Sequence, residues 1–143
     1  MLTSPFAGGR KGWRQTVNLM DKENEFNVNS KITNKFVNDL MLQLADGIKR
    51  ILGNGLIAVI LYGSFSRGDN QEYSDIDVVT IVDNNANEAY QKIFEFKECL
   101  ALENNLVISL IVIENSIFKK YVDIEPYYKN IKKDGVFYYG MAG

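Results

Sequence analysis

The sequence predicts an α/β (α+β) fold in which helices pack on a small mixed β-sheet. Three apolar runs have the length of strands, and the stretches between them repeat apolar residues at helical spacing. Helices that separate short apolar strands are typical of domains in which helices pack on a sheet. A chain of 143 residues can build one hydrophobic core. We therefore expect residues 30–143 to form a single domain.

The first predicted element is a helix that begins at Ser30 and ends at Gly53, residue types that cap helices at these two ends. Apolar residues recur at helical spacing between them. The expected buried face consists of Ile32, Phe36, Leu40, Leu44, Ile48 and Leu52. Strands are expected next at residues 56–62 and 75–83, on either side of a glycine–serine turn.

The second half of the chain predicts another helix, a third strand and two short helices. Residues 86–103 have a helical pattern, in which we expect Cys99 to be a small core residue. The aliphatic run at residues 107–113 is typical of a strand that is covered on both faces. Short helices are expected at residues 116–121 and 127–133, followed by an aromatic ending.

Residues 1–29 are predicted to be a flexible leader, because they are rich in glycine and polar residues and repeat at no structural period. We interpret residues 1–19 as an extension upstream of the natural start, with Met20 as the initiator. The alternative is that Trp13 anchors this segment to the body of the protein or to a partner.

Composition excludes several classes of function. The chain has no histidine, which excludes histidine acid–base catalysis and zinc–imidazole sites within it. A single cysteine cannot form an internal disulfide, and we expect a cytoplasmic protein. No apolar run could span a membrane or serve as a signal peptide, so no membrane partner is expected. The net charge is −2 and the cations cluster weakly, which disfavours a long nucleic acid as partner.

The functional signal is a Gly63-Ser64 turn followed, after ten residues, by Asp75 and Asp77. Side chains alternate along a strand, so these two carboxylates project from the same face. They repel one another unless a cation lies between them, and their oxygens suit Mg²⁺ or Mn²⁺. The glycine lets backbone amides approach a ligand closely, and the serine adds a hydroxyl. The pattern predicts a site for a nucleoside triphosphate and a divalent cation; the alternative is a simple turn before a solvated strand edge.

This segment resembles the signature of the DNA-polymerase-β-like nucleotidyltransferase superfamily. The ten-residue gap is similar to that of the minimal nucleotidyltransferases, which are often paired with a HEPN-domain partner in toxin–antitoxin modules. The specific likeness covers residues 56–83, and a weaker one runs through residues 110–113 and the tail at residues 127–135.

The resemblance implies a role for each residue of the motif. Gly63 and Ser64 would contact the phosphates of a bound nucleotide, while Asp75 and Asp77 would be the catalytic residues and would hold Mg²⁺. Arg67, one helical turn beyond the serine, is placed to reach a phosphate oxygen, unless it is a solvated turn residue. The implied reaction is attack of an acceptor hydroxyl on the α-phosphate, with ATP as the expected donor and pyrophosphate as the leaving group.

One departure from the superfamily pattern concerns a third carboxylate. The superfamily usually supplies this group from a neighbouring strand, where it completes the metal shell and can accept the proton of the acceptor. The run at residues 107–113 contains no acid, and Ser109 occupies its centre. Glu103 precedes this run, and Glu114 falls on the face opposite Ser109 if the strand is regular. We therefore expect weaker metal binding and the loss of a general base.

Two functions remain open on this basis. The first is an enzyme that transfers a nucleoside monophosphate to a hydroxyl of another molecule, with a HEPN-type toxin as the favoured acceptor. The second is a catalytically impaired binding module that docks on its partner as an antitoxin would. The missing acid favours the second function. An aromatic tail also favours it, unless the tail packs in the core. The aromatic residues of this tail are Tyr127, Tyr128, Phe137, Tyr138 and Tyr139. A homodimer without a partner is the third alternative.

Overall fold

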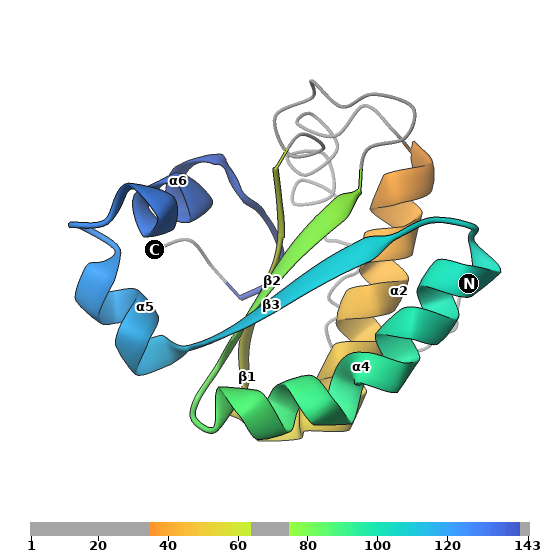
Figure 1. The fold of residues 1–143 in the computed structure, drawn as a ribbon, viewed down its shortest axis with the longest axis horizontal. Helices are drawn as coiled ribbons and strands as arrows, with labels where there is room; N and C mark the ends of the chain where they lie inside the picture. Colours follow the sequence, from red (N-terminus) through yellow and green to blue (C-terminus); the bar gives the residue numbers. More distant parts are fainter. Residues whose placement is uncertain (1–34, 64–74, 141–143) are drawn as a thin grey trace.

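The computed structural model describes residues 35–63 and 75–140, and Figure 1 shows their arrangement. In chain order the elements are α2 (Lys35–Leu52), the 3₁₀ turn η2 (Gly53–Gly55), β1 (Leu56–Tyr62), β2 (Ile76–Val82), α4 (Ala86–Glu103), β3 (Ile108–Glu114), α5 (Asn115–Tyr121), α6 (Pro126–Asp134) and β4 (Val136–Tyr139). The predictions for the leader at residues 1–29, for Ser64 and for Arg67 lie outside the described residues.

The strands form one mixed sheet with the order β3-β2-β1-β4. Strand β1 pairs antiparallel with both β2 and β4, whereas β2 and β3 run parallel. The predicted α+β class is confirmed, and β1 and α4 have the predicted bounds. Strand β4 was not predicted, although valine, phenylalanine and tyrosine favour strands. Its pairing with β1 supplies the edge of the sheet that the sequence pattern did not show.

The sheet separates two hydrophobic cores. Helices α2 and α4 cover one face, and α5 and α6 lie on the other (Figure 1). The larger core joins α2 and α4 to the side chains of Val59, Leu61, Ile76, Val78 and Ile108, among others. The smaller core lies beneath α5 and α6 and includes Ile60, Val79, Ile81, Ile113 and Ile131. Alternation along each strand therefore assigns odd-numbered positions of β2, including that of Asp77, to the α5–α6 face.

The buried face of α2 differs from the expected one at its first turn. Leu40, Leu44 and Ile48 are buried as expected, but the side chain of Phe36 is 50% exposed. Val37 and Met41 occupy the core in its place. A helix turns about 100° per residue, so the stripe centred on Leu40 and Leu44 continues through Val37 and leaves Phe36 beside it.

Two further expectations are wrong. Strand β3 is an edge strand among the described strands, and Ile111 is 46% exposed, so it is not covered on both faces. An all-aliphatic run does not distinguish an edge strand from a central one. Cys99 of α4 is exposed and lies beside the helix stripe that packs on the sheet. The described part of the chain contains no helix long and apolar enough to cross a membrane.

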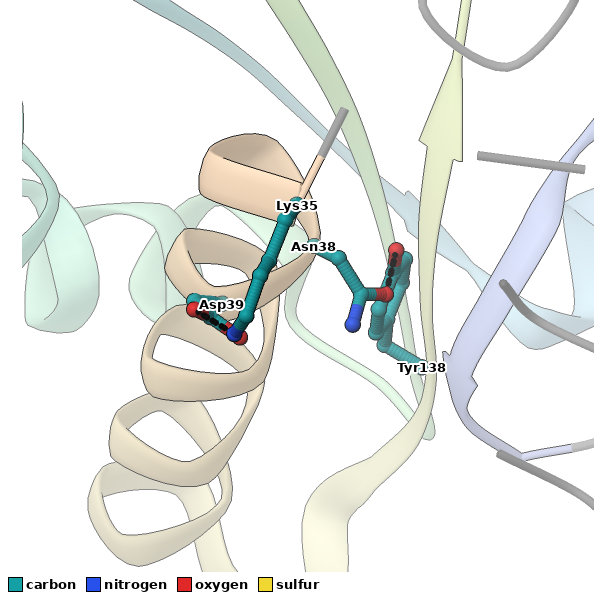
Figure 2. A network of polar contacts seen from close by, with 4 residues as sticks. All are labelled: Lys35, Asn38, Asp39 and Tyr138. Atoms are coloured by element: carbon teal, nitrogen blue, oxygen red, sulfur yellow. Dashed lines mark hydrogen bonds and ion pairs between the residues drawn. The ribbon is translucent and has the colours of Figure 1, made fainter. Parts of the chain in front are cut away.

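A partly buried hydrogen bond connects β4 to α2 (Figure 2). The hydroxyl of Tyr138 donates to Oδ1 of Asn38 at 2.8 Å. Tyr138 is buried, and burial raises the pKa of its hydroxyl, with a smaller contribution from the charge of Asp39. One turn away, Lys35 and Asp39 form an exposed ion pair on the surface of α2. The Tyr138–Asn38 bond is therefore a polar connection between the last described strand and the first described helix.

Replacing Tyr138 with phenylalanine should lower the free energy of unfolding by about 1 kcal/mol, because Asn38 loses a hydrogen-bond partner while the ring stays packed. Urea denaturation followed by circular dichroism measures this change. The Lys35→Ala variant is the control, since an exposed ion pair contributes little. A Tyr138→Phe variant as stable as the parent would show that this bond does not secure β4.

The same hydroxyl should make the fold sensitive to alkali. Burial raises the folded-state pKa of Tyr138 above that of the unfolded chain, which is about 10. The unfolded state then loses this proton first, so the stabilisation is complete below about pH 10 and is lost as the pH rises further. Urea midpoints at about pH 8 and about pH 11 should diverge less for Tyr138→Phe than for the parent. An equal loss in both proteins would assign the alkaline sensitivity to other groups.

Candidate functional site

The candidate site begins where β1 ends against β2. Antiparallel pairing places Tyr62 opposite Asp77, and Gly63 follows directly with φ of 83°. A Cβ atom added at Gly63 would overlap Oδ2 of Asp77. Glycine is favoured here for two reasons, since L-residues disfavour this φ and a Cβ atom would require the carboxylate of Asp77 to move. The structure thus brings the glycine of the motif and one of its acids together at a single corner.

The two acids of the motif differ in their surroundings. Asp75 directly precedes β2 and is exposed, whereas Asp77 is half-buried within the strand. Because the residues are two apart, alternation assigns both to the face that α5 and α6 cover. Asp77 lines a pocket on this face, whereas Asp75 is not among the described lining residues.

A pocket of about 220 Å³ lies beside Asp77. Its lining comes from three strands, from the turn after β1 and from α6; it includes Tyr62, Gly63, Asp77, Ser109, Ile111 and Tyr127. Two tyrosines and several aliphatic side chains make most of this surface apolar, and a carboxylate lies at one side. Apolar pockets with a few polar groups are the usual form of small-molecule sites. A concavity is therefore present at the corner of Gly63 and Asp77.

No third acid joins the pair among the described residues. In the parallel ladder of β2 and β3, the residue opposite Asp77 is Ser109, which also lines the pocket. Glu114 lies at the other end of β3, where its Oε2 accepts a hydrogen bond from the amide of Ala86 at 3.1 Å. Residues 35–63 and 75–140 contain no group of three acids or cysteines that could hold a metal. The sequence-based expectation that Glu114 is a poor substitute agrees with this geometry.

The donor groups at this corner suit a hard divalent cation with an incomplete set of protein ligands. Asp75 and Asp77 would supply carboxylate oxygens, the ligands that Mg²⁺ prefers. Mg²⁺ commonly binds proteins through one or two carboxylates and takes its other ligands from phosphates and water. The pair therefore fits a cation that arrives with a polyphosphate better than one held by the protein alone.

The sequence did not identify the aromatic part of the site. Tyr127 of α6 lies across the pocket from the strands, and its ring meets that of Tyr62 edge-on, with centroids 6.1 Å apart. The tail was noted as aromatic, but helical periodicity does not tell which strand end a helix will approach. Only the return of the chain through α5 and α6 places this tyrosine near Asp77.

The comparisons with known proteins agree with the motif. Residues 42–138 match the protein family described as "Nucleotidyltransferase domain". A Methanocaldococcus jannaschii protein named "Putative protein adenylyltransferase MJ0141" is 32% identical over 91 residues, which are 62% of this chain and 92% of the relative. A second protein of that organism, "Putative protein adenylyltransferase MJ0604", is 30% identical over 105 residues, which are 73% of this chain and 92% of the relative.

Among solved structures, the chain is similar to one described as a toxin–antitoxin crystal structure with AMP-PNP. The TM-score is 0.48 and the sequence identity 17%, over 70% of this chain and 73% of the other. This overlap is partial, and the family assignment rests on the sequence matches alone.

Replacing Gly63 with alanine should displace the Asp77 carboxylate and weaken binding of Mn²⁺ with ATP by on the order of tenfold or more. Isothermal titration calorimetry measures the affinity. Gly53→Ala is the matched control, because Gly53 also has a positive φ, of 61°, but open space around it. Both variants should lose roughly 1–2 kcal/mol of stability through backbone strain. Equal affinity in the two variants would contradict the proposed role of the Gly63 corner.

Replacing Ser109 with aspartate should add an anionic oxygen beside Asp77 and raise Mn²⁺ affinity roughly tenfold. Without a cation, the added repulsion should lower the melting temperature, and Mn²⁺ should restore it. Ser109→Asn is the control of similar size without the charge. If the aspartate variant binds Mn²⁺ no better than the asparagine variant, Ser109 does not lie at the cation position.

Proposed function

Because the chain belongs to the nucleotidyltransferase domain family, we propose that it transfers a nucleoside monophosphate from a nucleoside triphosphate to a hydroxyl group of a protein. The observation that carries this proposal is the corner at which Gly63 and Asp77 meet beside a pocket. A polyphosphate and the cation that accompanies it need this combination of a side-chain-free backbone and adjacent carboxylate oxygens.

Each part of the corner has a distinct task in the proposed reaction. The backbone at Gly63 lets the phosphates approach, because no Cβ obstructs them. Asp75 and Asp77 would hold the divalent cation, which when bound neutralises charge on the phosphates. Ser64 and Arg67 are proposed to contact phosphate oxygens, as the sequence motif implies. The protein then acts mainly by positioning and electrostatics, as is usual in phosphoryl transfer.

The chemical step joins the acceptor oxygen to the α-phosphorus while the bond from that phosphorus to the bridging oxygen of pyrophosphate breaks. Pyrophosphate leaves with the bonding electrons, and the acceptor hydroxyl gives up its proton. The described residues offer no acid beyond the motif pair at the corner. We therefore propose that water or a group of the acceptor molecule takes this proton, which makes catalysis depend on the acceptor.

A protein acceptor and ATP as donor are supported by the relatives. Both M. jannaschii relatives carry names that assign them to the protein adenylyltransferases, and the chain spans 92% of each. The spacing of the motif resembles that of minimal nucleotidyltransferases that pair with HEPN-domain toxins. We therefore propose a partner of that type, with Mg²⁺ as the physiological cation.

The alternative of a docking module without activity is supported by one observation, which is Ser109 opposite Asp77 in place of an acid. The aromatic tail supports it less than the sequence suggested. Tyr138 is buried, and Phe137 and Tyr139 pack against the two cores. Within the tail, exposed aromatic surface is concentrated at Tyr127, which lines the pocket.

The decisive experiment incubates the protein with Mg²⁺, the product of the neighbouring gene and ATP labelled at either the α- or the γ-phosphate. Transfer of the α-label alone identifies nucleotidyl transfer and separates it from a kinase activity. The Asp75→Asn/Asp77→Asn double variant should lower the rate by at least about a hundredfold, because the cation loses its protein ligands. Asp83→Asn, an exposed acid just past the other end of β2, should leave the rate unchanged.

The same assay can reject the enzyme. If no α-label moves and the double variant neutralises the partner as well as the parent does, the protein acts by docking. Label that moves equally in the double variant would place the chemistry away from the Asp pair.

A further inference from the structure

We propose that Tyr127 stacks on the nucleobase of the bound nucleoside triphosphate, and that the site consequently selects weakly among bases. This inference rests on the proposed function and extends it from the phosphates to the other end of the nucleotide. It assigns a task to the aromatic side of the pocket, which the phosphate and cation chemistry does not use.

The first observation is the position of Tyr127. Its side chain comes from the start of α6 and lines the same pocket as Gly63 and Asp77. Although it lines the pocket, Tyr127 remains 41% exposed to solvent. An exposed aromatic surface beside a polyphosphate site is available to a ring of the ligand.

The second observation is that neighbouring rings fix the plane of Tyr127. It meets Tyr62 at an interplanar angle of 84° and Tyr128 at 77°, with centroid distances of 6.1 Å and 5.4 Å. Tyr128 is itself held by Phe118 and by the stacked ring of Tyr121. Edge-to-face pairs of this kind are favourable aromatic contacts. The ring is thus oriented before a ligand arrives, which reduces the entropy lost on binding.

The third observation is the size and character of the pocket. Its volume of about 220 Å³ is below the roughly 300–1,000 Å³ typical of sites that enclose a whole ligand. It suits a ring system while the rest of the ligand lies outside. Ile111, which is 46% exposed, lines the pocket together with the two tyrosines, and its aliphatic surface suits the face or edge of a planar base.

Weak base selection follows from what lines the pocket. Asp77, which we assign to the cation, is the charged residue among the described lining residues, and no amide or guanidinium side chain joins it. The described polar groups left to read a base edge are the hydroxyls of Ser109 and the two tyrosines. Stacking itself tolerates different bases, because every base has an aromatic face. We expect ATP and GTP affinities within about tenfold of each other, since strong discrimination requires matched hydrogen bonds.

The test compares ATP with inorganic tripolyphosphate, which has the phosphates but no base. Affinities are measured by calorimetry with Mg²⁺ for the parent, Tyr127→Leu and Tyr127→Phe. Tyr127→Leu should weaken ATP binding roughly tenfold and leave tripolyphosphate binding unchanged. Tyr127→Phe should behave as the parent, since it keeps the ring. Tyr90→Leu, a tyrosine of α4 on the other side of the sheet, is the control for a lost tyrosine.

Each other result would overturn the inference. Unchanged ATP affinity in Tyr127→Leu would remove Tyr127 from the base site, and equal weakening of ATP and tripolyphosphate would place it at the phosphates. Loss of ATP binding in Tyr127→Phe would assign the effect to the hydroxyl. A preference above about a hundredfold between ATP and GTP would contradict weak selection. If the parent binds ATP no more tightly than tripolyphosphate, the stacking inference is wrong but the proposed function is not contradicted. If the parent binds neither ligand, the proposed function fails as well.

Discussion

The pairing of β1 with β2 is the constraint on which the site depends. The antiparallel register sets Tyr62 opposite Asp77, so the residue that follows the strand must pass the carboxylate of this aspartate. Gly63 can do so because it lacks a side chain and accepts a positive φ. A shift of one residue in this register would turn Asp77 into the larger core beneath α2 and α4. The hydrophobic pattern of two strands therefore determines where the charged corner forms.

The two cores have different consequences for the site. The larger core packs α2 and α4 against the face of the sheet opposite Asp77, and its side chains are uncharged. The smaller core, beneath α5 and α6, contains fewer residues, and Tyr62 at the end of β1 packs against it. Tyr62 and Tyr127 then line the pocket beside Asp77, and their rings combine an apolar body with a polar end. Rigid strands thus carry the acids, while a short helix carries the aromatic side.

The sequence predicted the parts of this arrangement that are local. The bounds of β1 and α4 follow from an apolar run and from a helical pattern, and Asp75 and Asp77 share a face by simple alternation. Local sequence patterns could not predict that β3 lies at the edge of the sheet or that β4 pairs with β1. Strand order depends on contacts between distant segments of the chain. Phe36 and Cys99 are exposed although both were expected in the core. Helical periodicity in the sequence therefore predicts which face of a helix is buried only to within about one residue position. Tyr127 was recognisable as an aromatic residue on a helix, but its approach to Asp77 depends on how the chain returns through α5 and α6.

The hydrogen bond between Tyr138 and Asn38 joins residues that are 100 positions apart in the chain. Strand β4 also supplies one neighbour of β1, so the first strand remains without that neighbour until the last one has been made. Ribosomes add roughly 5–20 residues per second, so the 100 positions between Asn38 and Tyr138 correspond to about 5–20 s of synthesis. Throughout that interval the nascent chain exposes an apolar strand edge to the cell. Closure of the described sheet during synthesis therefore has to wait until β4 has left the ribosome.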